Sequence, residues 1–111
     1  MHEMKLQDKY FNYILYGTKK IELRLYDEKR SLVKLNDTII FKNEITNETL
    51  KTKVIGLLRY NTFNDLFNDF SIEVLADKDM KKEELLEVLE QFYTKEKQEK
   101  YGVLGIRIEK V

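Results

Sequence analysis

The order of apolar and polar side chains predicts a short helix near the start of the chain. In residues 8–16 the apolar side chains recur at helical spacing, at Tyr10, Phe11, Ile14 and Leu15. Asp8 stands where a helix N-cap is expected, and Gly17 follows where the residue after a helix favours positive φ. We therefore predict an amphipathic helix that begins at Asp8 and ends before Gly17.

The spacing changes to that of a strand in residues 20–25. One face of this predicted strand is apolar and carries Ile21, Leu23 and Leu25. The other face is charged and carries Lys20, Glu22 and Arg24. Neighbours on one face of a strand lie roughly 6.5–7 Å apart, so these long side chains can reach one another.

The rest of the chain shows further strand and helix signals. Strands are predicted at residues 2–6, 38–42, 50–60 and 103–110, and helices at 63–70, 81–93 and 94–100. Gly56 indicates a bulge, Thr62 with Asp65 resembles a capping box, and Asp79 is expected to cap the helix at 81–93. Because strands and helices do not alternate regularly, a doubly wound parallel sheet is disfavoured. We expect an α+β fold, in which residues 1–111 form one domain with a small mixed β-barrel of about five strands and flanking helices.

Composition excludes several classes of site. The chain has 111 residues, no Cys and a single His, His2, so disulfides, thiolate metal sites and His clusters are excluded and no metal or organic cofactor is implied. No apolar run approaches the roughly 20 residues of a membrane helix, and residues 1–5 contain no signal-peptide core. We therefore expect a cytoplasmic protein that does not bind a membrane.

The net charge is zero, but the charges are unevenly distributed. Residues 1–60 carry 12 basic and 8 acidic side chains, and residues 61–111 carry 8 basic and 12 acidic ones. Such an asymmetry suggests a surface that binds polyanions. The alternative is that the acidic excess, chiefly in the helix at 81–93, is an ordinary solvated helix face.

The corner between the first helix and the following strand carries the most informative residues. Lys19 lies at this corner, next to the charged strand face that carries Lys20, Glu22 and Arg24. One interpretation is a solvated face, where exposed ion pairs contribute roughly 0–1 kcal/mol. The other is a cleft in which Glu22 positions Arg24 and a lysine for an anionic or hydrogen-bonding ligand.

These residues resemble the signature of the ASCH domain family, which is similar to the PUA domain. The pattern G-x-K-x-x-E-x-R is present as Gly17, Lys19, Glu22 and Arg24. Residues 10–17, 35–41, 60–66 and 103–111 resemble four further family segments in the same order. The resemblance covers nearly the whole chain and points to the small single-domain type found in bacteria and archaea.

The resemblance implies a PUA-like β-barrel with a cleft lined by the signature residues. It also implies that the ligand is RNA or a nucleotide. The predicted ligand-binding residues are Gly17, Lys19, Lys20, Glu22, Arg24, Arg30 and Tyr60. Further basic candidates are Lys29, Lys51, Lys53 and Arg59, and Tyr26 is a second candidate for stacking on a base beside Tyr60. In contrast, Tyr10, Phe11, Phe41 and Phe92 are expected to pack in the core.

Two other functions remain open. Some small family members resemble amidohydrolases of N4-acetylcytidine, with a Lys base, a Thr nucleophile three residues later and a Glu acid. Lys19 matches the base, but Glu22 stands in the Thr position and no Glu aligns near residues 77–79. Lys19 and Glu22 would be catalytic only in this hydrolase, or in another RNA hydrolase. The third hypothesis is a protein-interaction domain that uses the acidic helix at 81–93.

Overall fold

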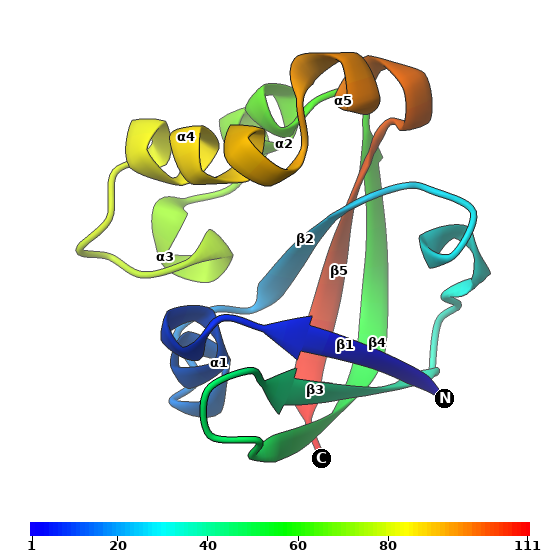
Figure 1. Cartoon of the computed structure of the whole chain (residues 1–111), viewed down its shortest axis with the longest axis vertical. Helices are drawn as coiled ribbons and strands as arrows, with labels where there is room; N and C mark the ends of the chain where they lie inside the picture. The colour runs from blue at the N-terminus through cyan, green and yellow to red at the C-terminus, as the bar shows by residue number, and fades with distance from the viewer.

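The strands form one curled sheet with two unpaired edges. The computed structural model describes residues 1–111 (Figure 1). Its strands are β1 (His2–Leu6), β2 (Ile21–Leu25), β3 (Thr38–Asn43), β4 (Thr49–Tyr60) and β5 (Val103–Lys110). The strand order is β1-β3-β4-β5-β2, with β1 parallel to β3 and every other pair antiparallel. The sheet is a five-stranded half-barrel with flanking helices, which confirms the predicted α+β fold.

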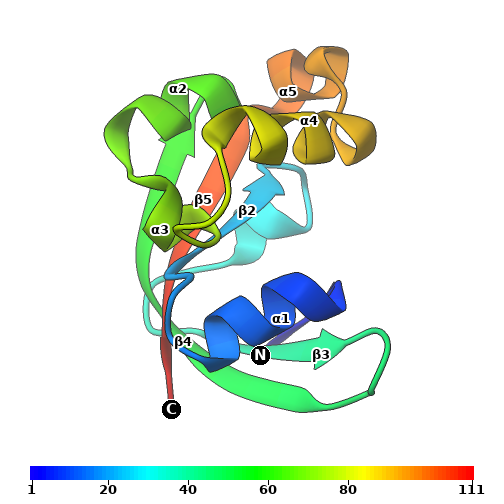
Figure 2. The same cartoon turned by 90° about the vertical axis from the view of Figure 1, so that its left-hand side faces the viewer.

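Five helices flank this half-barrel. They are α1 (Asp8–Leu15), α2 (Phe63–Asp69), α3 (Ile72–Leu75), α4 (Lys82–Phe92) and α5 (Lys95–Tyr101), with an additional 3₁₀ turn at Arg30–Leu32. Helices α2 to α5 gather at one end of the molecule, and α1 lies apart from them beside β3 (Figures 1 and 2). No helix has the length and apolar content that crossing a membrane requires.

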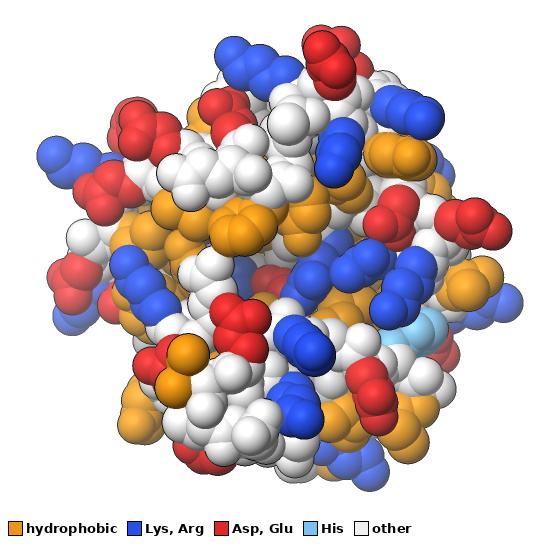
Figure 3. Space-filling model, viewed as in Figure 1, with side chains coloured by type: hydrophobic (Ala, Val, Ile, Leu, Met, Phe, Trp, Pro, Cys, Tyr) orange, Lys and Arg blue, Asp and Glu red, His pale blue; other side chains and the backbone are white.

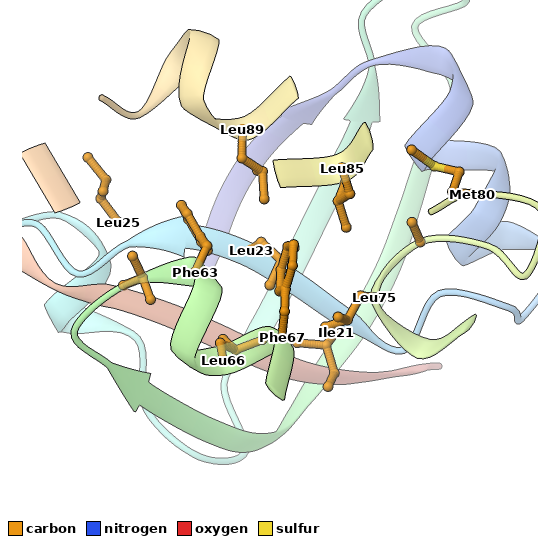
Figure 4. Close-up of a cluster of buried hydrophobic side chains, with 12 residues drawn as sticks. Ile21, Leu23, Leu25, Phe63, Leu66, Phe67, Leu75, Met80, Leu85 and Leu89 are labelled. Carbon is orange, nitrogen blue, oxygen red and sulfur yellow. The ribbon is translucent and has the colours of Figure 1, made fainter. Parts of the chain in front are cut away.

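Two apolar clusters lie on opposite faces of β5. The apolar face of β2 packs under α2, α3 and α4, together with Phe63, Leu66 and Leu85 (Figure 4). The opposite face of β5 sends Leu104, Ile106 and Ile108 into a second cluster beneath α1. Val103 belongs to the first cluster, so successive residues of β5 face different clusters.

Two positions in the fold require glycine, one for its backbone conformation and one for close packing. Gly17 has φ +85° directly after α1, as predicted, and this conformation turns the chain towards β2. At Gly105 a Cβ atom would lie 3.0 Å from Leu66 Cδ1 and 3.1 Å from Ile21 Cγ2. Helix α2 and strand β2 can therefore pack closely over β5 only because this position lacks a side chain.

Some local predictions are confirmed and others are wrong. The register of β4 shifts between Val54 and Gly56, and the hydroxyl of Thr62 accepts a hydrogen bond from the Asp65 N–H at 3.2 Å, as predicted. Asp8 is not an N-cap, because Gln7 precedes the helix and the Asp8 carboxylate accepts a hydrogen bond from Asn43 Nδ2 at 2.8 Å.

The start of α4 also differs from the prediction. The residue before α4 is Lys81, so Asp79 does not cap this helix. Helix α3, which has only four residues, was not predicted because so short a segment shows no apolar periodicity.

Candidate functional site

A pocket lies where the unpaired edges β1 and β2 face helix α4. Its volume is about 190 Å³. One wall is largely apolar and comes from α4 and the residue after it: Leu85, Val88, Leu89, Phe92 and Tyr93. The remaining lining comes from β1, α1, β2 and three connecting segments: Lys5, Leu6, Gln7, Tyr10, Lys19, Glu22, Leu23, Arg24 and Glu44. Figure 3 shows a hollow at the centre of this face, with hydrophobic atoms along its upper edge.

The register of β2 explains why its charged side chains reach this pocket. Glu22 pairs with Ile106 of β5, and Arg24 pairs with Leu104. Paired residues project to the same face of a sheet, so Glu22 and Arg24 point to the concave side of the half-barrel. Since no strand covers the free edge of β2, both side chains line the pocket.

Glu22 lies at the centre of a buried ion-pair network. Its side chain is only 6% exposed. One carboxylate oxygen, Oε2, accepts a hydrogen bond from Arg24 Nε at 3.0 Å and lies 2.9 Å from Arg24 Nη2. The other, Oε1, accepts a hydrogen bond from the Leu23 N–H at 3.1 Å and lies 3.6 Å from Lys19 Nζ. Both oxygens are therefore held in place by neighbouring groups of the protein.

Lys19 ties this network to the helical end of the molecule. Its Nζ donates hydrogen bonds to the carbonyls of Ile21 and Leu75, each at 2.6 Å, and the third neighbour is the Glu22 carboxylate. Three acceptors match the three N–H donors of an ammonium group. The side chain is 2% exposed, so the lysine is a buried cation that joins β2 to α3.

Burial and pairing act against each other on the pKa values of these groups. Burial lowers the pKa of Lys19, and the neighbouring Glu22 carboxylate only partly opposes this. Burial alone would raise the pKa of Glu22, but Arg24, Lys19 and the Leu23 N–H together hold it below its ordinary value. Burial likewise opposes the charge on Arg24, but Glu22 and Tyr93 together more than compensate, so the pKa of Arg24 is raised. Glu22 and Arg24 are thus a charged pair at neutral pH.

The structure separates the predicted site residues into three places. Lys19, Glu22 and Arg24 line the pocket together. Gly17 and the exposed Lys20 lie at the preceding corner and do not line it. Arg30 lines an adjacent groove, which it shares with Arg24.

Tyr60 lies outside both the pocket and the groove. Its hydroxyl donates a hydrogen bond to Asp69 at 2.6 Å, and the ring borders a different depression near α5. Tyr26 is already stacked, because the Arg59 guanidinium lies 3.7 Å from the centre of its ring. Lys51 and Lys53 are exposed on β4 and line neither the pocket nor the groove.

Two aromatic side chains that we expected in the core line the pocket instead. Phe92 is 53% exposed at the end of α4, and Tyr10 is half-buried on α1. Burial raises the pKa of Tyr10, with Tyr13 and Glu22 contributing in the same direction. The expectation is confirmed for Phe11 and Phe41, which are 1% and 0% exposed. The one sequence signal for Phe92 is its position at the end of the apolar stripe of α4, beyond the residues of that stripe that are buried in the core.

Comparison with known proteins identifies a matching family and similar solved structures. A family model described as ASCH domain matches residues 4–111. Among curated proteins, none matches this chain. The crystal structure of the hypothetical protein PH0355 is 42% identical over 99% of this chain and 98% of that chain, with a TM-score of 0.88. The solution NMR structure of protein PF0455 from Pyrococcus furiosus is 38% identical over 100% of this chain and 98% of that chain, with a TM-score of 0.79.

A more distant structure shares the fold alone. The ASCH domain from Lactobacillus crispatus JV V101 is 15% identical over 98% of this chain and 79% of that chain, with a TM-score of 0.71. The family match spans nearly every residue, including the segment that carries Gly17, Lys19, Glu22 and Arg24. This chain therefore belongs to the ASCH domain family.

Proposed function

We propose that this ASCH domain binds RNA by placing one unpaired nucleobase in the pocket between β2 and α4. The observation that carries the proposal is the contrast between the two sides of the pocket. Val88, Phe92 and their neighbours on α4 offer an apolar wall, and the fixed charges of Lys19, Glu22 and Arg24 lie opposite. A nucleobase has an apolar face that stacks and a polar edge that forms hydrogen bonds, so it suits both sides.

The size of the pocket supports a single small group. Its volume of about 190 Å³ is below the roughly 300–1,000 Å³ of sites for drug-sized ligands. The bases of a duplex are stacked and paired, whereas an unpaired base can leave its strand and enter a recess. The exposed ring of Phe92 at the rim provides a surface for stacking.

The hydrolase interpretation finds less support in the arrangement of Lys19. A general base needs a lone pair directed at the substrate, but Lys19 Nζ donates hydrogen bonds to two backbone carbonyls and lies 3.6 Å from the Glu22 carboxylate. The contacts of this amine are therefore made within the protein. Glu22 is likewise held by Arg24, Lys19 and the Leu23 N–H. Asp77 and Asp79 do not line the pocket, so the segment where the resembled amidohydrolases carry their acid supplies none here. The network is suited to holding a ligand in a fixed position.

Fluorescence anisotropy with a labelled single-stranded RNA tests the proposal. Val88→Trp fills the pocket from α4 and should weaken binding by roughly tenfold or more, equivalent to about 1.4 kcal/mol. Gln91→Trp is the matched control, because Gln91 is exposed on the same helix and does not line the pocket. Equal affinity of the two variants, or no binding by the unmodified protein, would contradict the proposal.

A second assay separates binding from hydrolysis. The protein is incubated with N4-acetylcytidine and with the same RNA, and products are followed by chromatography. We expect both to remain intact. Turnover that is lost in Lys19→Ala would instead support the hydrolase.

A further inference from the structure

We infer that a groove on the outer face of β1 and β3 binds the phosphates of the nucleotides that flank the base in the pocket. This inference rests on the proposed function. The groove has a volume of about 650 Å³ and shares Lys5 and Arg24 with the pocket, so the two adjoin at these residues. A strand of RNA that places a base in the pocket would leave it along this groove.

The lining of the groove is strongly cationic. It contains five basic side chains, Lys5, Arg24, Lys29, Arg30 and Lys42, and one acidic side chain, Glu3. Lysine and arginine side chains gather over β1 and β3, below and to the right of the central hollow (Figure 3). A concave surface of one charge concentrates the field and attracts a ligand of opposite charge.

Most of this charge is not neutralised within the protein. No carboxylate lies within 4.0 Å of the amine of Lys5, Lys29 or Lys42. All three side chains are exposed, so a ligand can reach them. A lysine held in an ion pair would be less available to a ligand. These three lysines are not held in this way.

Two of the free lysines also lie side by side. Lys5 of β1 and Lys42 of β3 are register partners on adjacent strands. Like charges directly opposite each other on a sheet destabilise it. The Arg24 guanidinium, which is paired with Glu22, also lies nearby and donates a hydrogen bond to the Lys5 carbonyl at 2.9 Å. A bound phosphate would neutralise this concentration of charge.

Arg30 adds an independent observation at the edge of the groove. Its Nη1 pairs with Asp27 at 3.2 Å, but its Nε atom is buried and has no hydrogen-bond partner. A buried donor without an acceptor is costly, and the oxygens of a phosphate group are strong acceptors. A phosphate in the groove would reach this donor only if the guanidinium turned outward.

The experiment compares two charge-reversed double variants that carry the same change in net charge. Lys29→Glu/Lys42→Glu alters the groove, and Lys78→Glu/Lys97→Glu alters exposed lysines that line neither the groove nor the pocket. Anisotropy of a labelled single-stranded RNA of roughly 10 nucleotides, within the length that small single-strand binding domains cover, is measured at several salt concentrations. The groove variant should bind roughly tenfold more weakly, with a salt dependence shallower by about 0.7 in log–log slope for each lost phosphate contact.

The outcomes distinguish the groove from the pocket. If the groove variant loses affinity and salt dependence while the control keeps both, the inference is supported. If both double variants bind equally well while Val88→Trp does not bind, the pocket proposal stands and the groove inference is overturned. If the unmodified protein binds no RNA, both fail, and a protein partner for this surface becomes the better hypothesis.

Discussion

The guanidinium of Arg24 in β2 donates a hydrogen bond to the backbone carbonyl of Lys5 in β1 at 2.9 Å. These two strands are the free edges of the sheet and share no ladder of hydrogen bonds. The same guanidinium binds the Glu22 carboxylate through Nε and Nη2. Arg24 therefore links the opposite edges of the half-barrel and fixes the mouth of the pocket.

Arg24→Lys should loosen this link while preserving the charge. A lysine lacks the planar fork that contacts two partners at once, so at least one of the contacts is lost. We expect a loss of about 1–3 kcal/mol in the free energy of unfolding. Amide hydrogen exchange should also accelerate in His2–Leu6, which otherwise pairs only with β3. Unchanged exchange in this strand would show that the contact does not hold the edges together.

Glu22→Ala should destabilise the fold by about 3–5 kcal/mol, because it leaves Lys19 and Arg24 buried without their partner. Urea unfolding at neutral pH measures the loss, and Lys78→Ala serves as an exposed control. A loss below about 0.5 kcal/mol would match an ion pair in open solvent instead.

The effect of Glu22 should depend on pH in a defined direction. Its pKa in the folded protein lies below its ordinary value, so near the ordinary value of about 4.3 the unfolded state binds more protons. The stabilisation by the carboxylate is therefore complete above that pH and is lost as the pH falls through the folded-state pKa. The difference in unfolding free energy between the unmodified protein and Glu22→Gln should shrink across this acidic range. A difference that grows with acidity would have the wrong sign.

Gly105→Ala should destabilise the protein through overpacking. The new methyl group would lie 3.0 Å from Leu66 Cδ1 and 3.1 Å from Ile21 Cγ2, both in the core. Overpacking of this kind costs roughly 1–3 kcal/mol, which chemical denaturation can resolve. A variant as stable as the unmodified protein would mean that α2 can shift away from β5 at little cost.

Lys42→Gln should stabilise the free protein at low salt. The substitution removes the repulsion between Lys42 and its register partner Lys5, which is worth about 0.2–1 kcal/mol. Because both side chains are exposed, the gain should disappear at high salt. Loss of stability at low salt would show that Lys42 contributes to the fold rather than opposing it.

Local patterns predicted the elements that hold the site better than the site itself. The change of spacing between α1 and β2 identified Gly17, Lys19, Glu22 and Arg24, since helix end, corner and strand face all follow from neighbouring residues. The partner of Lys19 at the carbonyl of Leu75 lies 56 residues away and arises only from tertiary packing. No local signal marks a backbone carbonyl as the acceptor for a buried amine.

The apolar wall of the pocket was missed for a related reason. An apolar stripe on a helix shows which face is turned inward, but not whether a partner covers its full width. Leu85, Leu89 and Phe92 of this stripe on α4 all line the pocket, but Leu85 and Leu89 are buried whereas Phe92 is exposed. The error at Asp8 is similar, because Asn43 from β3 engages the carboxylate that would otherwise cap the helix.

An NMR titration of the isotope-labelled protein with a short single-stranded RNA tests the central claim most directly. We predict that chemical shifts change at β2 and at α4 around Val88 and Phe92, and extend to Lys5 and Lys42 in the groove. Changes confined to the surface around Tyr60 and Tyr101, or no changes at all, would contradict binding in the pocket.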